Sequence, residues 1–174
     1  MIYTDTKQII LDATVKLMKA NKPNKLTVQN ILDEAHVSRS TFYSFFSDKY
    51  DVINYYFKSY LDSTVNKNQN LENSCAFQFL YDNKDYFIKA FSVEGQNSFE
   101  DFFYNFNYDY CTKMYLANTN KESLSDEDRL SIEFYCMGGM HLAKQWLKGG
   151  AKESPLMMTE LTHKLTPEKY WKLL

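Results

Sequence analysis

Helix-breaking residues are scarce in this sequence, and that scarcity limits the fold more than any other feature. The 174 residues include only five glycines and three prolines. A β-sandwich or barrel needs such residues at its many turns, whereas a bundle of long helices needs few. Hydrophobic residues make up 44% and charged residues 24%, the proportions of a globular chain. The sequence therefore predicts an all-α fold.

The first part of the chain is predicted to form four helices joined by short connections. Thr27, Ser38 and Ser47 are residues of the N-cap type, and each precedes a segment with apolar residues at helical spacing. Pro23 ends the first helix because it disfavours helical backbone in the residue before it. The fourth helix is long and ends at the Asn-rich stretch 66–70. The four expected helices cover about residues 6–22, 28–35, 39–46 and 49–65.

The rest of the chain is also predicted to be helical. Ser98 and Ser125 each precede an acidic residue by three positions, a spacing similar to that of a capping box. Gly149 and Gly150 are predicted to end the helix that begins after Ser125, and the two later prolines suit the first position of a helix. The expected helices cover about residues 73–83, 84–93, 98–118, 126–148, 155–164 and 167–174.

Several classes of protein are excluded by what the sequence lacks. It has no apolar run long enough to span a membrane and no N-terminal signal pattern, so we expect a cytoplasmic protein without a membrane partner. Its three cysteines have no paired spacing, which indicates reduced thiols rather than a disulfide framework. It has no P-loop, dinucleotide-binding turn, nucleophile elbow or HExxH motif, so we expect neither enzyme activity nor a cofactor.

Charge is distributed unevenly along the chain, although the net charge is only −2. Residues 1–60, the head, contain eight basic and six acidic residues, whereas the remainder, the body, contains 12 basic and 16 acidic residues. This distribution permits a polyanionic partner at the head without requiring one.

The segment from Thr27 to Lys49 indicates the biochemical function. Its sequence, TVQNILDEAHVSRSTFYSFFSDK, predicts two short helices joined by the three-residue turn 36–38. Such spacing is typical of a helix-turn-helix, which places its second helix in the major groove of DNA. A helical hairpin with capped ends and no DNA partner is the alternative. The phenylalanines of the second helix are expected to face inward, and they are Phe42, Phe45 and Phe46.

Polar residues are then left on the outer side of the second helix, and their types suit contact with DNA. Arg39 is the expected base-contacting residue, because a guanidinium group matches the two acceptors on the edge of guanine. Ser40 and Thr41 are small enough to let the helix N-terminus approach the bases. Hydroxyl and ammonium groups near helix N-termini suit phosphate, which the backbone N–H groups there also favour. Those residues are Thr27, Ser38, Tyr43 and Lys49.

At these residues the sequence resembles the TetR family of bacterial transcriptional regulators. The family pattern, similar to LTV..I...A.VSR.TFY.YF..K, is present here from Leu26 to Lys49, and the resemblance extends over roughly residues 6–60. It implies that phosphates are held by Thr27, Ser38, Tyr43 and Lys49. It also implies that the bases are faced by Arg39, Ser40, Thr41 and Ser44.

Two residues depart from the family pattern. His36 stands in the turn where the family usually has glycine, and histidine tolerates a left-handed backbone better than most residues. Phe45 stands where many members have a residue that contacts phosphate, and its ring cannot form that hydrogen bond.

The resemblance also implies how the chain is organised. It implies an N-terminal DNA-binding domain over 1–48 and a C-terminal domain over 49–174 that forms a dimer and often binds a small molecule. A second likeness, in 146–150 and at Ser154-Pro155, is to a branch similar to regulators of dihydroxyacetone kinase operons. The candidate dimer residues are Ile132, Tyr135, Met140, Trp146, Leu156, Met157 and Leu161.

The aromatic residues between Phe99 and Tyr115 are either ordinary core or the wall of a ligand pocket. Tyrosine and histidine add polar tips to an apolar wall, as ligand sites require. The candidate lining residues are Phe103, Tyr110, Tyr135 and His141. Cys136 and His141 are five residues apart, so they lie on different faces of a helix, and we expect no metal site. Gly138-Gly139 indicates either a close approach of another helix or ligand, or a local kink.

Taken together, these features predict a transcriptional regulator that binds a pseudo-palindromic DNA operator as a homodimer. The resemblance implies a repressor whose effector, a small molecule of unknown identity, shifts the long fourth helix. The alternative is a co-regulator of the same fold that acts mainly by binding another protein.

Overall fold

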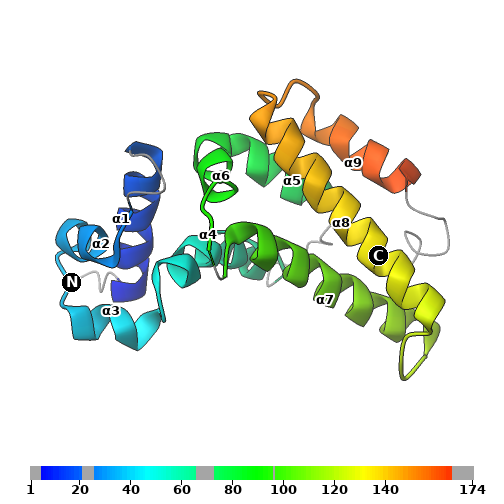
Figure 1. The fold of residues 1–174 in the computed structure, drawn as a ribbon, viewed down its shortest axis with the longest axis horizontal. Coiled ribbons are helices and arrows are strands. Elements are labelled where there is room, and N and C mark those ends of the chain that lie inside the picture. Colours follow the sequence, from blue (N-terminus) through cyan, green and yellow to red (C-terminus); the bar gives the residue numbers. More distant parts are fainter. Residues whose placement is uncertain (1–4, 21–25, 66–72, 96, 166–174) are drawn as a thin grey trace. The chain divides into compact units, whose positions relative to one another are not determined.

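The structure is a computed structural model that describes residues 5–20, 26–65, 73–95 and 97–165. These residues form α-helices and contain no strand, as the sequence predicts (Figure 1). The helices are α1 (Thr6–Ala20), α2 (Val28–Ala35), α3 (Arg39–Phe45), α4 (Lys49–Val65), α5 (Asn73–Asp82), α6 (Lys84–Ala90), α7 (Phe99–Thr119), α8 (Asp126–Lys148) and α9 (Pro155–Leu165). The helix predicted over 167–174 lies outside the described residues.

The described residues pack as two compact units. The first contains α1 to α4, α6 and the connection from α6 to Phe99, and the second contains α5, the rest of α7, α8 and α9. No described helix is long and apolar enough to cross a membrane. The predicted boundary at residue 48 separates a DNA-binding domain from a C-terminal domain by function, not by packing. It stays a prediction.

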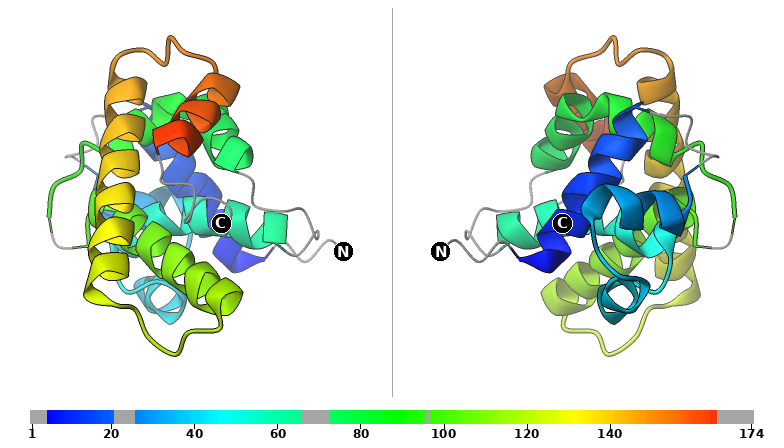
Figure 2. Two further views of the ribbon diagram at one scale, coloured as in Figure 1. Left: turned by 90° about the vertical axis from the view of Figure 1, so that its right-hand side faces the viewer. Right: turned by 90° about the vertical axis from the view of Figure 1, so that its left-hand side faces the viewer.

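The core of the first unit forms around α1, which packs against α2, α4 and α6. The right-hand view of Figure 2 shows α1 in blue with α2 beside it. Phe57, Phe87 and Phe99 pack ring against ring, with centroids 5.3–6.0 Å apart. Tyr86 is fully buried, and its hydroxyl donates to the carbonyl of Ile53 at 2.9 Å. This bond satisfies a polar atom that would otherwise be costly to bury.

The predicted N-caps of α2 and α3 are confirmed. Thr27 and Asn30 form a reciprocal capping box at the start of α2, and the Ser38 hydroxyl accepts from the backbone N–H of Thr41 at 3.1 Å. The expected cap of α4 is wrong. Asp48, not Ser47, accepts the N–H of Asp51 at 2.8 Å. Asp48 is one residue nearer the helix than Ser47. Its negative carboxylate also interacts favourably with the positive end of the helix dipole, which the neutral hydroxyl of Ser47 does not.

The second unit contains a hairpin of α7 and α8 and a pair formed by α5 and α9. Buried residues Cys111, Tyr115, Ile132 and Cys136 pack together between α7 and α8. α9 packs against α5, as Figure 2 shows on the left. The Trp146 ring packs edge-on against that of Phe77, with ring centroids 5.6 Å apart. The indole N–H of Trp146 donates to the carbonyl of Glu153 at 3.0 Å.

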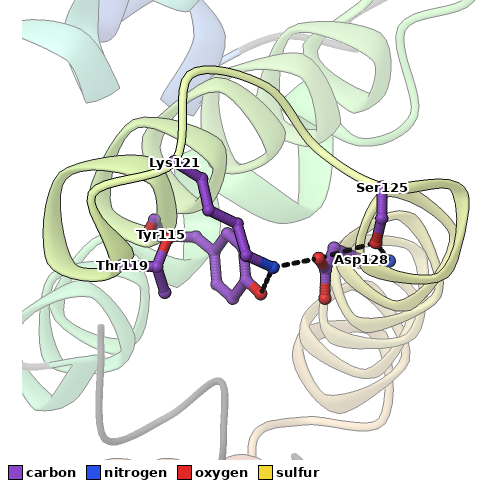
Figure 3. Close-up of polar contacts among 5 residues, drawn as sticks. All are labelled: Tyr115, Thr119, Lys121, Ser125 and Asp128. Carbon is purple, nitrogen blue, oxygen red and sulfur yellow. Dashed lines mark hydrogen bonds and ion pairs between the residues drawn. The ribbon is translucent and has the colours of Figure 1, made fainter.

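A polar cluster connects the two helices of this hairpin (Figure 3). Asp128, on α8, is 3% exposed, and its carboxylate accepts from Lys121 Nζ at 2.8 Å and from the Ser125 hydroxyl at 2.7 Å. Lys121 also donates to the phenolic oxygen of Tyr115 at 2.9 Å. Because a buried carboxylate without a partner of opposite charge is strongly unfavourable, we expect the ion pair with Lys121 to stabilise this position of Asp128.

We expect Lys121→Met to lower the free energy of unfolding at neutral pH. Hydrogen bonds to Asp128 and then to Tyr115 raise the pKa of Lys121 from 10.5 to about 12. Its contribution to stability is therefore complete below pH 10.5 and is lost as the pH rises through about 12. Urea unfolding of both proteins across this range should show a stability difference that is constant at first and then shrinks.

Lys113→Met is the matched control, because Lys113 is an exposed lysine of α7 with no ion pair among the described residues. We expect no pH-dependent difference for it. A Lys121→Met variant as stable as the wild type would contradict the proposed role of the cluster.

Candidate nucleic-acid interface

The turn between α2 and α3 has the backbone shape that a helix-turn-helix requires. His36 has φ 52° and ψ 42°, the left-handed region, and its N–H donates to the carbonyl of Leu32. The N–H of Val37 donates to the same carbonyl at 3.2 Å. Histidine thus occupies the position at which the family pattern has glycine, and the turn is preserved.

Phe42 and Phe46 determine which side of α3 faces inward. Both rings are buried, and their centroids are 5.9 Å apart. Phe45 was also predicted to face inward, but its side chain is 39% exposed. Residues four apart share a face of a helix, whereas Phe45 is turned by about 100° from Phe46, so all three rings cannot face inward.

The outer side of α3 carries the residues expected to contact DNA. Arg39, Ser40, Tyr43 and Ser44 are exposed, and Thr41 is half-buried. Tyr43 is 48% exposed and rests with its ring edge-on to Phe42 at 5.4 Å. Its phenol is therefore open to a partner on the outer side of α3.

Hydroxyl groups gather at the N-terminus of α3. The Ser38 hydroxyl lies 2.9 Å from that of Ser40 and 2.7 Å from that of Thr41. The Ser44 hydroxyl donates to the carbonyl of Thr41 at 2.7 Å. The Ser38 hydroxyl caps the short helix, and each of these hydroxyl groups is able to donate and accept a hydrogen bond with DNA.

Arg39 is oriented by a residue that the sequence analysis did not single out. Its guanidinium donates to the side-chain oxygen of Gln29 on α2 at 3.2 Å, and Gln29 donates in turn to Asp33 at 2.8 Å. A guanidinium has five donors, so this single bond leaves the group able to contact a base edge. The i, i+4 spacing of Gln29 and Asp33 was a local signal, but nothing in the sequence connected it to Arg39.

Lys49 lies at the start of α2 although it belongs to α4. Its ammonium donates to the carbonyl of Leu26 at 3.1 Å, next to the capping residue Thr27. The structure therefore brings together two of the expected phosphate-contacting residues, one from each helix. An ammonium beside a helix N-terminus is suited to a phosphate group.

In the body, the four candidate ligand residues do not form one site. Phe103 and Tyr135 line a small cavity of about 50 Å³. Tyr135 and His141 line an open groove of about 940 Å³ along α8 and the end of α9. Tyr110 packs beside the buried residues between α7 and α8 and lines neither space.

The candidate dimer residues divide into three groups, and Tyr135 forms one of them because it is half-buried. Ile132, Met140 and Trp146 are buried within the second unit and were wrongly placed on the surface. Leu156, Met157 and Leu161 are exposed, as expected. Periodicity alone does not identify the further exposed apolar side chains, because α8 has apolar residues on opposite faces; they are Leu130, Phe134 and Met137 on α8 and Leu165 at the end of α9. We call these seven exposed residues the apolar face.

Gly138 and Gly139 lie in the groove, and neither is closely covered. A Cβ built on either would have no heavy atom within 4 Å apart from its own helix. They therefore do not serve helix contact inside the described chain.

Cys111 and Cys136 are buried together in the second unit. A hydrogen bond that the Cys136 thiol donates to Cys111, together with burial, raises the pKa of Cys136, so this thiol stays neutral. The described residues contain no group of three potential metal ligands.

Two family profiles match the chain. The profile described as "Bacterial regulatory proteins, tetR family" matches residues 10–56. The profile described as "Transcriptional regulator C-terminal region" matches residues 74–168. The second match alone covers more than half of the chain.

Individual proteins of known function are also similar to this chain. The sequence is 26% identical over 103 residues to the HTH-type dhaKLM operon transcriptional activator DhaS of Lactococcus lactis subsp. lactis (strain IL1403). The match covers 56% of this chain and about half, 54%, of the length of that relative. The solved structure of the dihydroxyacetone kinase operon activator DhaS has a TM-score of 0.66 and 18% identity, covering 96% of this chain and 97% of that one. The fatty acid degradation regulator FadR from Bacillus halodurans has a TM-score of 0.63 and 16% identity, covering 95% and 96%. At these identities the two structures show a shared fold.

The strain at His36 gives a test of the turn. We expect His36→Gly to change the free energy of unfolding by less than about 1 kcal/mol, because glycine accepts φ 52° without strain. His36→Val should lower it by about 1–2 kcal/mol, since a β-branched residue is disfavoured in this region. Urea unfolding measures both. Equal effects of glycine and valine would show that the left-handed conformation does not limit this position.

Proposed function

Because the chain belongs to the TetR family of bacterial transcriptional regulators, we propose that it binds a pseudo-palindromic DNA operator as a homodimer and represses transcription in response to a ligand. One observation supports this most: α3 exposes Arg39, Ser40, Tyr43 and Ser44 on one side, while Lys49 lies beside Thr27 at the start of α2. A base-contacting face with phosphate-contacting groups at its edge is how a helix-turn-helix docks in the major groove.

The proposed contacts divide into two kinds. Arg39, Ser40, Thr41 and Ser44 contact bases, with Arg39 donating to guanine. Thr27, Ser38, Tyr43 and Lys49 contact phosphates, which fix the position of α3 but carry no sequence information. Phe45 is exposed, yet its ring adds no hydrogen bond to phosphate.

The apolar face supports a dimer. Phe134 is 83% exposed, and the other six members lie on the same two helices, α8 and α9. Several large apolar side chains exposed on two helices are unfavourable in water, and such a surface favours an interface. A two-fold dimer would place two copies of α3 about 34–36 Å apart, one turn of DNA, and would therefore match an inverted repeat.

The effector site is proposed in the body. The groove lined by Tyr135 and His141 is large enough for a small molecule. Four members of the apolar face also line this groove, so in the proposed dimer it would lie at the subunit interface; they are Leu130, Phe134, Met137 and Leu165. The space lined by Phe103 and Tyr135 would have to widen to accept one. Binding would change the spacing of the two copies of α3 through the long α4, so DNA and effector would affect each other's affinity reciprocally. The protein would repress transcription if the operator overlaps a promoter. DhaS is by name an activator, and an operator upstream of the promoter would favour activation by this chain instead.

The direct test is selection of fragmented genomic DNA from the source organism on the purified protein at two salt concentrations. We expect enrichment of one inverted repeat, with affinity that falls steeply as salt rises because phosphate contacts release counterions. The double variant Tyr43→Ala/Lys49→Ala should lose the enrichment. Salt-insensitive background without an enriched sequence would contradict the proposal and favour a protein partner.

Single variants separate the two kinds of contact. Tyr43→Ala should weaken binding to all sequences about equally, whereas Arg39→Ala should relax the preference at one base position by roughly 1–3 kcal/mol. Fluorescence anisotropy on the selected repeat and on single-base variants of it measures both. Phe45→Ala is the control on the same helix, and it should not change the salt dependence. Unchanged affinity of Tyr43→Ala would remove Tyr43 from the phosphate contacts.

Phe134→Ser tests the dimer. Removing the most exposed ring of the apolar face should raise the dimer dissociation constant by roughly 10- to 30-fold. Sedimentation equilibrium measures the change. Gln145→Ser is a suitable control, because Gln145 is also exposed on α8 but lies outside the apolar face. A monomeric wild-type protein, or a Phe134→Ser dimer as tight as the wild type, would contradict the proposed interface.

A further inference from the structure

The connection between α6 and α7 is bonded to the first two turns of α4. The Tyr50 hydroxyl donates to the carbonyl of Glu94 at 3.0 Å. The Asn54 side-chain amide donates to the carbonyl of Asn97 at 3.1 Å. Tyr50 and Asn54 are four residues apart and share one face of α4. The backbone of this connection is therefore held at the end of α4 that begins with Lys49.

Gly95 shows how closely the backbone approaches Tyr50. A Cβ at Gly95 would lie 2.5 Å from the Tyr50 hydroxyl oxygen and 3.0 Å from the ring carbon that carries it. Gly95 also has φ 135°, which side chains other than glycine rarely adopt. The absent side chain leaves room for the phenol, and the unusual φ sets the course of the backbone beside it, so the position of Tyr50 depends on the conformation of this connection.

Tyr50 in turn contacts the proposed phosphate-contacting residue. The Lys49 ammonium lies 5.1 Å from the centroid of the Tyr50 ring, within the range of a cation–π interaction. It also donates to the carbonyl of Leu26. The ring and the carbonyl attract the same ammonium and hold it beside Thr27. An ammonium has three donors, and the bond to Leu26 uses one.

We propose that Tyr50 is a positioning residue for DNA binding: it holds Lys49 for phosphate and makes that contact depend on the connection between α6 and α7. The proposal rests on the proposed function, because it assigns Tyr50 a role through Lys49. A change of backbone at Glu94 and Gly95 moves the phenol, and the ammonium then loses one of its two attractions. Binding of phosphate by Lys49 favours the bonded state of the connection in return.

A double-mutant cycle tests the proposal on the full chain. The probe is a fluorescently labelled random-sequence DNA duplex, titrated at several salt concentrations. Lys49→Ala should reduce the slope of log affinity against log salt by about one. Tyr50→Ala should weaken binding roughly 2- to 5-fold, and it should have no further effect when Lys49 is already alanine.

Two more variants separate positioning from general stability. Tyr50→Phe keeps the ring but removes the bond to Glu94, so it should weaken binding less than Tyr50→Ala and should also have no effect without Lys49. Tyr55→Ala is the matched control, because Tyr55 is a half-buried tyrosine of α4 whose ring contacts Lys7 at 3.9 Å instead of Lys49. Any effect of Tyr55→Ala should add to that of Lys49→Ala.

The outcomes separate this inference from the proposed function. Full additivity of Tyr50→Ala and Lys49→Ala, in a wild-type protein that binds the duplex, would overturn the positioning role alone. A Tyr50→Phe variant with wild-type affinity would overturn the dependence on the connection. A wild-type protein without salt-dependent binding to DNA would overturn the proposed function, and this inference with it.

Discussion

The burial of Phe42 is the interaction on which the proposed DNA interface depends. Its ring is completely enclosed, and α3 has only seven residues, too few to be stable as an isolated helix. The helix therefore exists because Phe42, with Phe46, packs inward. That packing determines the orientation of α3, and the residues on the other side follow from it. The Ser38 cap and the left-handed backbone of His36 then fix where the helix begins and its direction relative to α2.

The sequence predicted the helices of this fold well because their ends depend on local chemistry. Capping by Thr27, Ser38 and Ser125 requires only a side chain and the backbone three residues later. The cap of α4 was misassigned because Ser47 and Asp48 are both capping residues, and only the backbone geometry distinguishes them. The TetR resemblance was likewise local, since its residues lie within one contiguous segment, and the family profiles confirm it.

Features that join distant segments could not be predicted in the same way. No pattern connects Arg39 with Gln29 or Lys49 with Leu26, because these pairs depend on the packing of separate helices. In the body, α8 carries apolar residues on two faces, and periodicity alone cannot tell which face is covered within the chain. Ile132 is buried whereas Phe134 is exposed, although both are large apolar residues two positions apart. For the same reason, the sequence could not show that the candidate ligand residues line a small cavity and a separate groove instead of one site.

In the proposed dimer, two copies of α3 related by a two-fold axis contact one face of a DNA duplex. Hydroxyl-radical footprinting on DNA that the protein selects tests this most directly, because it maps every protected sugar along both strands. A two-fold dimer should give two symmetric protected patches on one face, separated by one helical turn of about 10–10.5 base pairs. A single patch, or continuous protection without two-fold symmetry, would contradict it.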